Sequence, residues 1–213
     1  MKNWTLRQRI LASFAVIIAI MLLMVVVSYS RLLKIESSEA SVRDDALPGL
    51  YYSSMVRSAW VDTYLQTQEM LGLKEGQGFS AEEAEKFKTF QARLQEQMTR
   101  YQETVTTEED KVEYAVFEKL HENYHKVLAS VLDLHKRNQE VEAIKMFNEQ
   151  LTPAWTAGRM KLNDIIRENK AVADVDVANI DDAVLTAKTI MGISLLVAIL
   201  AAGLCGLLLM RAI

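Results

Sequence analysis

Two long apolar runs lie near the ends of the chain and predict helices that cross a membrane. Residues 10–27 and 190–210 contain no charged side chain over 18 and 21 positions, and a helix needs about 20 apolar residues to span the hydrocarbon core of a bilayer. Neither run keeps the polar face that a core helix of a globular domain normally carries. We therefore predict transmembrane helices at residues 10–29 and 189–210.

Between the predicted spans, apolar residues recur at steps of three and four, which places them on one face of each helix. Two such stripes are Phe87, Phe90, Leu94, Met98 and Tyr101, and Phe117, Leu120, Tyr124, Val127, Val131 and Leu134. Loop signals at residues 72–80 and 104–110, with a weaker boundary at 137–140, separate four helices. Ser80 and Glu83 form a capping box before the second helix. The pattern predicts an all-α protein with an up-down-up-down four-helix bundle between the spans.

The two prolines predict local features of the first and fourth bundle helices. Pro48 is expected to interrupt and kink the first helix, because proline removes a backbone hydrogen bond and its ring crowds the preceding turn. Pro153 follows Thr152, a residue type that caps helix N-termini, and proline is favoured at the first helical position. We therefore expect a short helical piece at residues 141–150 and a restart of the helix at Pro153, with Thr152 as its N-cap.

Composition supports helices, and the charge distribution predicts the orientation in the membrane. The 213 residues include only 8 glycines and 2 prolines, so helix-breaking residues are few. All 28 acidic residues lie between the two spans, and that segment has a net charge of −8, whereas the residues before the first span are basic. Because Lys and Arg that flank a span stay in the cytoplasm, we expect residues 1–9 and 211–213 there and residues 30–188 outside.

The first span and the cysteine content each add one conclusion. A basic start before an apolar run is also found in cleaved signal peptides, but this run is long for one and lacks a convincing small-x-small cleavage site, so we expect an uncleaved anchor in membrane lipid. The single cysteine, Cys205, lies inside the second span, so helix packing must hold the outer domain together without disulfides.

The chain has no basic patch with interleaved aromatic residues, which argues against a nucleic-acid partner.

One motif has metal-binding spacing, the stretch HENYH at residues 121–125. This H-E-x-x-H pattern places two imidazoles on one helical face beside a glutamate, as in zinc proteases. The extended protease pattern needs glycine at 128 and histidine at 131, where this chain has Leu128 and Val131. His135 is 14 residues from His121, about 21 Å by helical rise, which is too far to share an ion. We therefore expect no bound metal, no cofactor and no enzymatic activity.

The order of these features resembles the transmembrane sensor half of bacterial methyl-accepting chemotaxis proteins. The more specific stretches are ALPGLYYSSMVRSAW at residues 46–60 and Arg211-Ala212-Ile213, which looks like the start of a cytoplasmic linker. The resemblance implies a homodimer in the bacterial inner membrane, whose periplasmic bundle binds a small organic acid or amino acid at the subunit interface. It also implies that binding shifts the fourth helix and the second span, and so signals to a cytoplasmic signalling module absent from this chain.

Two other functions fit the same pattern. The sensor half could belong to a histidine kinase or a cyclic-dinucleotide enzyme, which residues beyond 213 would distinguish. The chain could also be a membrane-anchored structural helical bundle, although its many aromatic residues and the proline at a predicted helix start argue against a plain spacer.

The resemblance also implies ligand-binding residues. In amino-acid-sensing members, an arginine of the first helix grips the ligand carboxylate beside a threonine at the start of the fourth, and Arg57 and Thr152 stand in comparable places. Two further arginines of that pocket would fall near Asp62 and Gln66, which are not basic, so a different organic acid is expected. An anion near Thr152 would also meet free N–H groups at the predicted helix start. The nearby aromatic residues suit a cyclic or aromatic acid, or else belong to the bundle core: Trp60, Tyr64 and Trp155.

Overall fold

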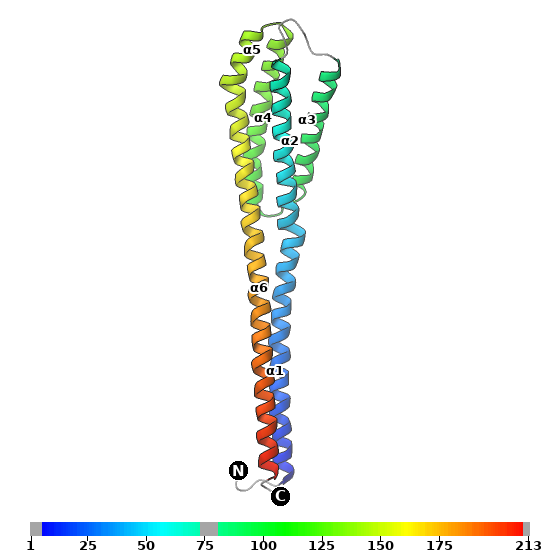
Figure 1. Ribbon diagram of the computed structural model, residues 1–213, viewed down its shortest axis with the longest axis vertical. Helices are drawn as coiled ribbons and strands as arrows, with labels where there is room; N and C mark the ends of the chain where they lie inside the picture. The colour runs from blue at the N-terminus through cyan, green and yellow to red at the C-terminus, as the bar shows by residue number, and fades with distance from the viewer. Residues whose placement is uncertain (1–5, 73–80, 211–213) are drawn as a thin grey trace. The chain divides into compact units, whose positions relative to one another are not determined.

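The computed structural model describes residues 6–72 and 81–210, and these residues contain helices and turns but no strand (Figure 1). The prediction of an all-α protein is confirmed. The chain divides into two compact units. One unit is residues 42–174, and the other combines the segment up to residue 41 with the segment from residue 175 onward.

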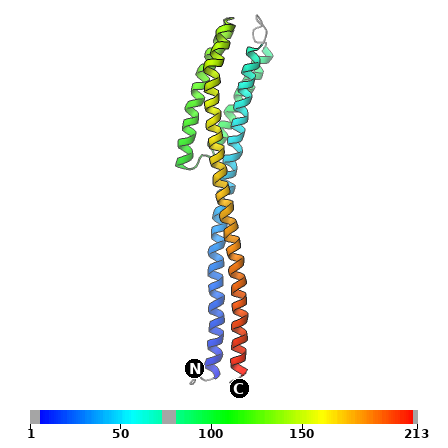
Figure 2. The ribbon, with the colours of Figure 1, turned by 60° about the vertical axis from the view of Figure 1, so that its left-hand side comes forward.

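The unit of residues 42–174 is a four-helix bundle, as predicted. Its first three helices are α2 (Leu47–Leu71), α3 (Ala81–Gln102) and α4 (Glu108–Lys136). The fourth is built from α5 (Glu140–Met146), a π-helical segment η2 (Phe147–Leu151) and the first part of α6 (Thr152–Met210). Figures 1 and 2 show these four helices side by side.

The apolar stripes predicted from the sequence form the core of this bundle. Their most buried members are Phe87, Leu94, Met98, Tyr101, Phe117, Tyr124 and Val131, and they pack with Val56, Trp60, Leu151, Leu162 and Ile165 from the first and fourth helices. Burial of such side chains stabilises a fold by about 1.5–3 kcal/mol each. The core therefore holds all four helices together in a domain that has no disulfide.

Both ends of α4 carry residue types that favour helix ends. The Thr107 hydroxyl accepts a hydrogen bond from the backbone N–H of Asp110 at 3.1 Å, so it caps α4 as a helix-start threonine should. At the other end of α4, Asn138 has a φ of 57°, in the left-handed region that asparagine tolerates after a helix. The predicted capping box at Ser80 and Glu83 involves a residue outside the described ranges.

Both prolines follow a π-helical segment, which confirms one prediction in part and corrects another. Pro48 comes two residues after η1 (Val42–Ala46), and Pro153 comes two residues after η2. Proline cannot donate to the carbonyl four residues earlier and its ring pushes that carbonyl away; the wider π-helical turn accommodates this displacement. The regular α-helix is therefore interrupted just before Pro48, as predicted, although the backbone remains helical there. Thr152 is itself helical and directly follows η2, so the predicted N-cap before Pro153 is wrong.

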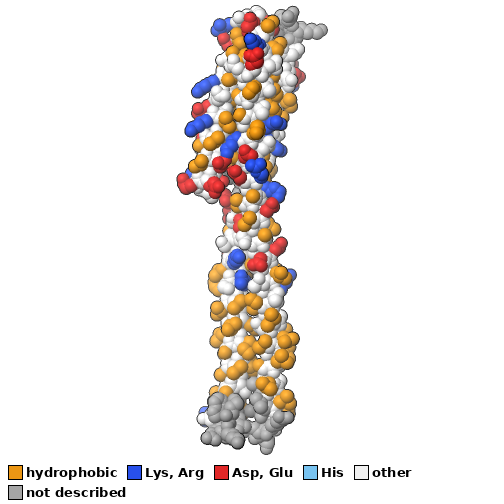
Figure 3. All heavy atoms as spheres, turned by 90° about the vertical axis from the view of Figure 1, so that its left-hand side faces the viewer, with side chains coloured by type: hydrophobic (Ala, Val, Ile, Leu, Met, Phe, Trp, Pro, Cys, Tyr) orange, Lys and Arg blue, Asp and Glu red, His pale blue; other side chains and the backbone are white. Residues whose placement is uncertain are grey.

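The second unit consists of α1 (Leu6–Ser41) and the later part of α6, and it carries the apolar runs. Two described helical stretches, within residues 10–71 and 140–204, are long and apolar enough to cross a membrane. Their apolar side chains are largely exposed, and hydrophobic residues dominate this part of the surface in Figure 3. Where α1 ends, the Ser41 hydroxyl donates to the Asp176 carboxylate at 2.6 Å. This unit fits a two-pass membrane protein.

Candidate functional site

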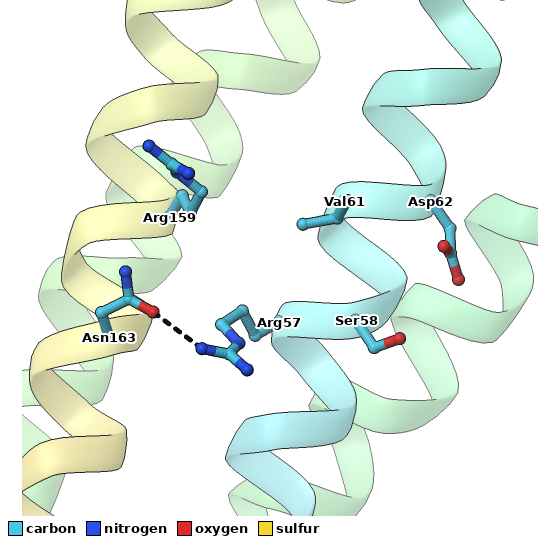
Figure 4. Close-up of a pocket in the computed structure, with 6 residues that line it drawn as sticks. All are labelled: Arg57, Ser58, Val61, Asp62, Arg159 and Asn163. Carbon is cyan, nitrogen blue, oxygen red and sulfur yellow. Dashed lines mark hydrogen bonds between the residues drawn. The ribbon is translucent and has the colours of Figure 1, made fainter.

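An open cavity of about 350 Å³ lies on the side of the bundle, between α2 and α6 (Figure 4). It is lined by Arg57, Ser58, Val61, Asp62, Arg159 and Asn163. In Figure 4 the side chains of Arg57 and Val61 extend from α2 toward α6, whereas Ser58 and Asp62 point to the other side of α2. The region between α2 and α6 is therefore bordered by two guanidinium groups, one amide and one apolar side chain.

Arg57 reaches the fourth helix of the bundle. Its Nη1 donates a hydrogen bond to Oδ1 of Asn163 at 3.2 Å, across 106 residues of sequence. The side chain is exposed, and the bond uses one of the five N–H donors that a guanidinium carries. The remaining donors suit the two oxygens of a carboxylate, which a guanidinium can bind side by side.

The arginines of the bundle show that this cavity differs from the rest of its surface. Residues 42–174 contain seven arginines. Five of them form an ion pair with a carboxylate: Arg43, Arg93, Arg100, Arg137 and Arg167. In the described structure, the two without a carboxylate partner are Arg57 and Arg159, and both line the cavity. Asp62, the one acidic lining residue, is already paired with Arg93 at 3.5 Å. The cavity therefore carries positive charge that the bundle itself does not neutralise.

A column of stacked side chains runs along α6 to the edge of the cavity. Tyr64 stacks between Phe147 and Trp155, with ring centroids 5.3 and 4.2 Å apart. The Arg159 guanidinium lies over the Trp155 ring at 4.9 Å, a cation–π contact. The Tyr64 hydroxyl and the Thr152 hydroxyl are 2.9 Å apart, and Thr152 donates to the Phe147 carbonyl at 3.0 Å. Tyr64 is consequently the donor to Thr152, and the column is fixed by both stacking and hydrogen bonds.

Trp60 lies inside the core rather than in the cavity. Its side chain is fully buried, and its ring contacts Tyr124 and Phe117 at centroid distances of 4.5 and 5.6 Å. The Trp60 indole N–H donates to the Trp155 carbonyl at 3.1 Å, and the Trp155 indole N–H donates to the Trp60 carbonyl at 3.4 Å. This reciprocal pair joins α2 to α6 beside the cavity.

The structure changes the predicted environment of Thr152. Its backbone is helical, with φ −60° and ψ −44°, and it follows η2 directly, so it is not a helix cap. The helix start that precedes it is at Glu140, about 18 Å away by helical rise. Arg57 bonds to Asn163, which is about 16 Å along α6 from Thr152. The predicted free backbone N–H groups at Thr152 are therefore absent, and within one chain Thr152 lies about three helical turns from the residue that Arg57 contacts.

The two histidines of the HENYH stretch contact each other and the core. Their ring centroids are 4.3 Å apart, and His121 also lies 5.8 Å from the Trp60 ring. Burial, with a smaller effect from the charge on His125, lowers the pKa of His121 to about 4. Burial also lowers the pKa of His125. Among residues 6–72 and 81–210, no group of three or more His, Cys, Asp or Glu side chains could hold a metal ion.

Of the residues that line the cavity, the sequence prediction named Arg57 but not Arg159 or Asn163. Arg159 follows Thr152 by seven residues and Trp155 by four, a spacing that places all three on one helical face. That periodicity was available in the sequence. The sequence does not show that Arg159 lacks a carboxylate partner, because ion pairing depends on side chains from neighbouring helices.

A four-helix bundle in a chain that also carries two helices apolar enough to cross a membrane fits a membrane-linked sensory domain. The chain belongs to the family of four-helix-bundle sensory modules for signal transduction, whose family model matches residues 3–184. No curated protein and no solved structure gives a match. The family match confirms the resemblance to the sensor half of methyl-accepting chemotaxis proteins, and membership of a signal-transduction family indicates a sensor.

Proposed function

We propose that this chain is the ligand-sensing and transmembrane signalling part of a bacterial chemoreceptor, and that it binds a small organic anion in the cavity between α2 and α6. The observation that carries the proposal is the exposed Arg57 beside that cavity, which has no carboxylate partner in the described structure. A carboxylate that leaves water needs a charge-assisted partner. The cavity volume of about 350 Å³ falls within the usual range of small-molecule sites, roughly 300–1,000 Å³.

The aromatic residues expected at the site are assigned supporting roles in this proposal. Trp60 is fully buried, and Tyr64, Thr152 and Trp155 are engaged with one another in the stacked column. They hold α2 and α6 at the spacing that forms the cavity. Trp155 also contacts Arg159, so it is the member of this group nearest to a bound anion.

A homodimer is supported by an exposed seam along α2. Positions spaced alternately by four and three residues form a heptad pattern: Leu47, Tyr51, Ser54, Ser58, Val61 and Leu65. Leu47, Tyr51 and Leu65 are 52%, 58% and 53% exposed, which is unusual for large apolar side chains arranged in a coiled-coil register. Ser58 and Val61 belong to both the seam and the cavity. A second copy packed on this seam would therefore border the ligand site.

Transmission to the cytoplasm is proposed to occur through α6. One continuous α-helix runs from Thr152 to Met210, and it carries Arg159 and Asn163 as well as the second apolar run. A small shift of a packed helix is a known form of signalling movement. The charge distribution along the chain supports a bundle in the periplasm and an inner-membrane location. A chemoreceptor signalling module, or that of a histidine kinase or cyclic-dinucleotide enzyme, would receive the signal.

Ligand-dependent stability tests the proposed site. The full chain in detergent micelles is screened by thermal unfolding against organic acids and amino acids, and a ligand at 100 times its dissociation constant should stabilise it by about 2.7 kcal/mol. Arg57→Ala should abolish this stabilisation and leave the unliganded midpoint nearly unchanged. Arg100→Ala is the matched control, because Arg100 is also an exposed bundle arginine but pairs with Glu96 away from the cavity. Unchanged affinity of Arg57→Ala, or a neutral compound as the tightest ligand, would contradict the proposal.

Disulfide cross-linking tests the dimer. In a Cys205→Ser background, Ser54→Cys lies on the seam and should form a disulfide-linked dimer in membranes, because facing seam residues come within disulfide distance. Glu96→Cys on α3 is the control and should remain monomeric. Cross-linking at position 96 but not at position 54 would place the dimer contact elsewhere.

A further inference from the structure

We infer that the ligand carries two acidic groups, and that Arg159 of α6 binds the second one while Arg57 of α2 binds the first. The inference rests on the proposed function and specifies the class of ligand that the site accepts. It assigns a binding role to Arg159, and it makes the ligand a bridge between two helices of the bundle.

The first observation is the state of the Arg159 side chain. The side chain is exposed, and its guanidinium stacks on the Trp155 ring at 4.9 Å. Stacking uses the flat face of the guanidinium and leaves the N–H groups at its edge available. Within the described residues, Arg159 has no hydrogen-bond acceptor and no carboxylate partner. The Trp155 ring therefore holds the Arg159 guanidinium in place, and the N–H groups of that guanidinium have no anionic partner in the described structure.

The second observation is how the two arginines are distributed. Arg57 extends from α2, and its partner Asn163 is four residues after Arg159 on α6. Residues four apart in a helix lie on the same face, about 6 Å apart along the axis. The two arginines thus come from the two helices that line one cavity, and on α6 the position of Arg159 is about one helical turn from the residue that Arg57 contacts. Two separate carboxylates fit this arrangement better than one.

The third observation is the charge and lining of the cavity. Its two arginines contribute two positive charges, and Asp62 is neutralised by Arg93. An anion with one acidic group would leave one guanidinium without a counter-ion, whereas a dianion would match both. Val61 projects between the arginines from α2 (Figure 4) and offers an apolar contact for a short carbon chain that links the two acids.

The test compares acids that differ only by a second carboxylate. The full chain in detergent micelles is titrated calorimetrically with three matched pairs: butanoate and butanedioate, pentanoate and pentanedioate, and benzoate and benzene-1,2-dicarboxylate. At least one diacid should bind roughly ten- to hundredfold more tightly than its monoacid, the size expected for one added charge-assisted contact.

Variants then assign that difference to Arg159. Arg159→Gln should weaken diacid binding by the same factor and leave monoacid binding unchanged, because Arg57 still holds one carboxylate. Arg159→Lys should restore part of the loss, since it keeps the charge without the two-pronged geometry. Arg167→Gln is the matched control, because Arg167 is an exposed α6 arginine paired with Asp164, and it should bind as the wild type does.

The outcomes separate this inference from the proposed function. Equal affinity for the mono- and diacids, or a diacid preference that survives Arg159→Gln, overturns the inference while an anion site at Arg57 stands. If no member of any pair binds, both the inference and the proposed function for this cavity fail. If Arg57→Ala binds the diacids as tightly as the wild type, the shared site between α2 and α6 is wrong.

Discussion

Gly158 gives a prediction in which packing reverses an ordinary rule of helix stability. Replacing a glycine inside a helix with alanine normally stabilises the helix by about 1 kcal/mol. At Gly158, a Cβ would lie 2.6 Å from Cζ2 and 3.0 Å from Cε2 of Trp60, whereas carbon atoms at their optimal separation are about 3.5–4.0 Å apart. The Gly158→Ala variant therefore requires Trp60 or α6 to move by about 1 Å.

Trp60 has little freedom to make that movement. Its ring is fully buried against Tyr124 and Phe117, and its indole N–H is bonded to the Trp155 carbonyl at 3.1 Å. Overpacking of a tight core costs about 1–3 kcal/mol, and the position of this clash places Gly158→Ala in the upper part of that range. After the gain in helix propensity, a net loss of about 1–2 kcal/mol remains.

Chemical and thermal unfolding of the full chain in detergent, followed by circular dichroism at a helical wavelength, measures this loss. The midpoint temperature should fall by roughly 3–8 °C for a unit of this size. Gly49→Ala is the comparison, because its Cβ would meet only the amide end of the Asn169 side chain, which is partly exposed and can shift at the cost of its hydrogen bond to the Ile165 carbonyl. A Gly158→Ala variant that is more stable than the wild type would refute the described packing of Trp60 on α6.

Three other predictions follow from particular contacts. Tyr64→Phe should lower the free energy of unfolding by about 1 kcal/mol, because it removes the hydrogen bond to Thr152. The double variant Tyr64→Phe, Thr152→Val should lose less than the sum of the two single variants. Additive losses in urea titrations would show that the two hydroxyls do not share a bond. Because burial lowers the pKa of His121 to about 4, the unfolded chain takes up a proton between about pH 6.5 and 4 that the folded chain does not. The contribution of neutral His121 to the free energy of unfolding is therefore fully present above about pH 6.5 and should be lost as the pH drops through this window. In His121→Gln, the free energy of unfolding should decrease less between about pH 7 and 5 than it does in the wild type. A reporter active only in the periplasm should be silent when fused after Ile213 and active when inserted at Gly76; the reverse pattern would disprove the orientation.

The sequence was sufficient for the features that depend on local periodicity. A stripe such as Phe117, Tyr124 and Val131 repeats at helical spacing, so its burial could be predicted before any partner helix was known. The same holds for the cap at Thr107, where the capping residue and the backbone it binds are three positions apart. Helix number, the bundle core and the apolar runs are all of this kind.

The candidate site depended on contacts between distant parts of the chain, and there the sequence was insufficient. Arg57 and Asn163 are 106 residues apart, and nothing local shows that Arg159 lacks the carboxylate partner that the other bundle arginines have. Thr152 before Pro153 has the same local sequence as a helix start. A helix that continues through this point needs the π-helical turn at residues 147–151, and the sequence rules for caps do not anticipate such a turn.

The π-helical segments before Pro48 and Pro153 also constrain how this chain can change in length. A π-helical turn accommodates about one more residue than an α-helical turn, and each residue added to a regular helix turns everything beyond it by about 100°. Losing one residue from residues 42–46 or 147–151 would let the turn relax to an α-helix while the apolar faces on either side keep their directions. The proline would then sit in a regular helix interior, at a cost of about 3 kcal/mol. In relatives of this chain, the extra residue and the proline should therefore be gained or lost together, so that a one-residue gap in an alignment coincides with the absence of proline at the corresponding position.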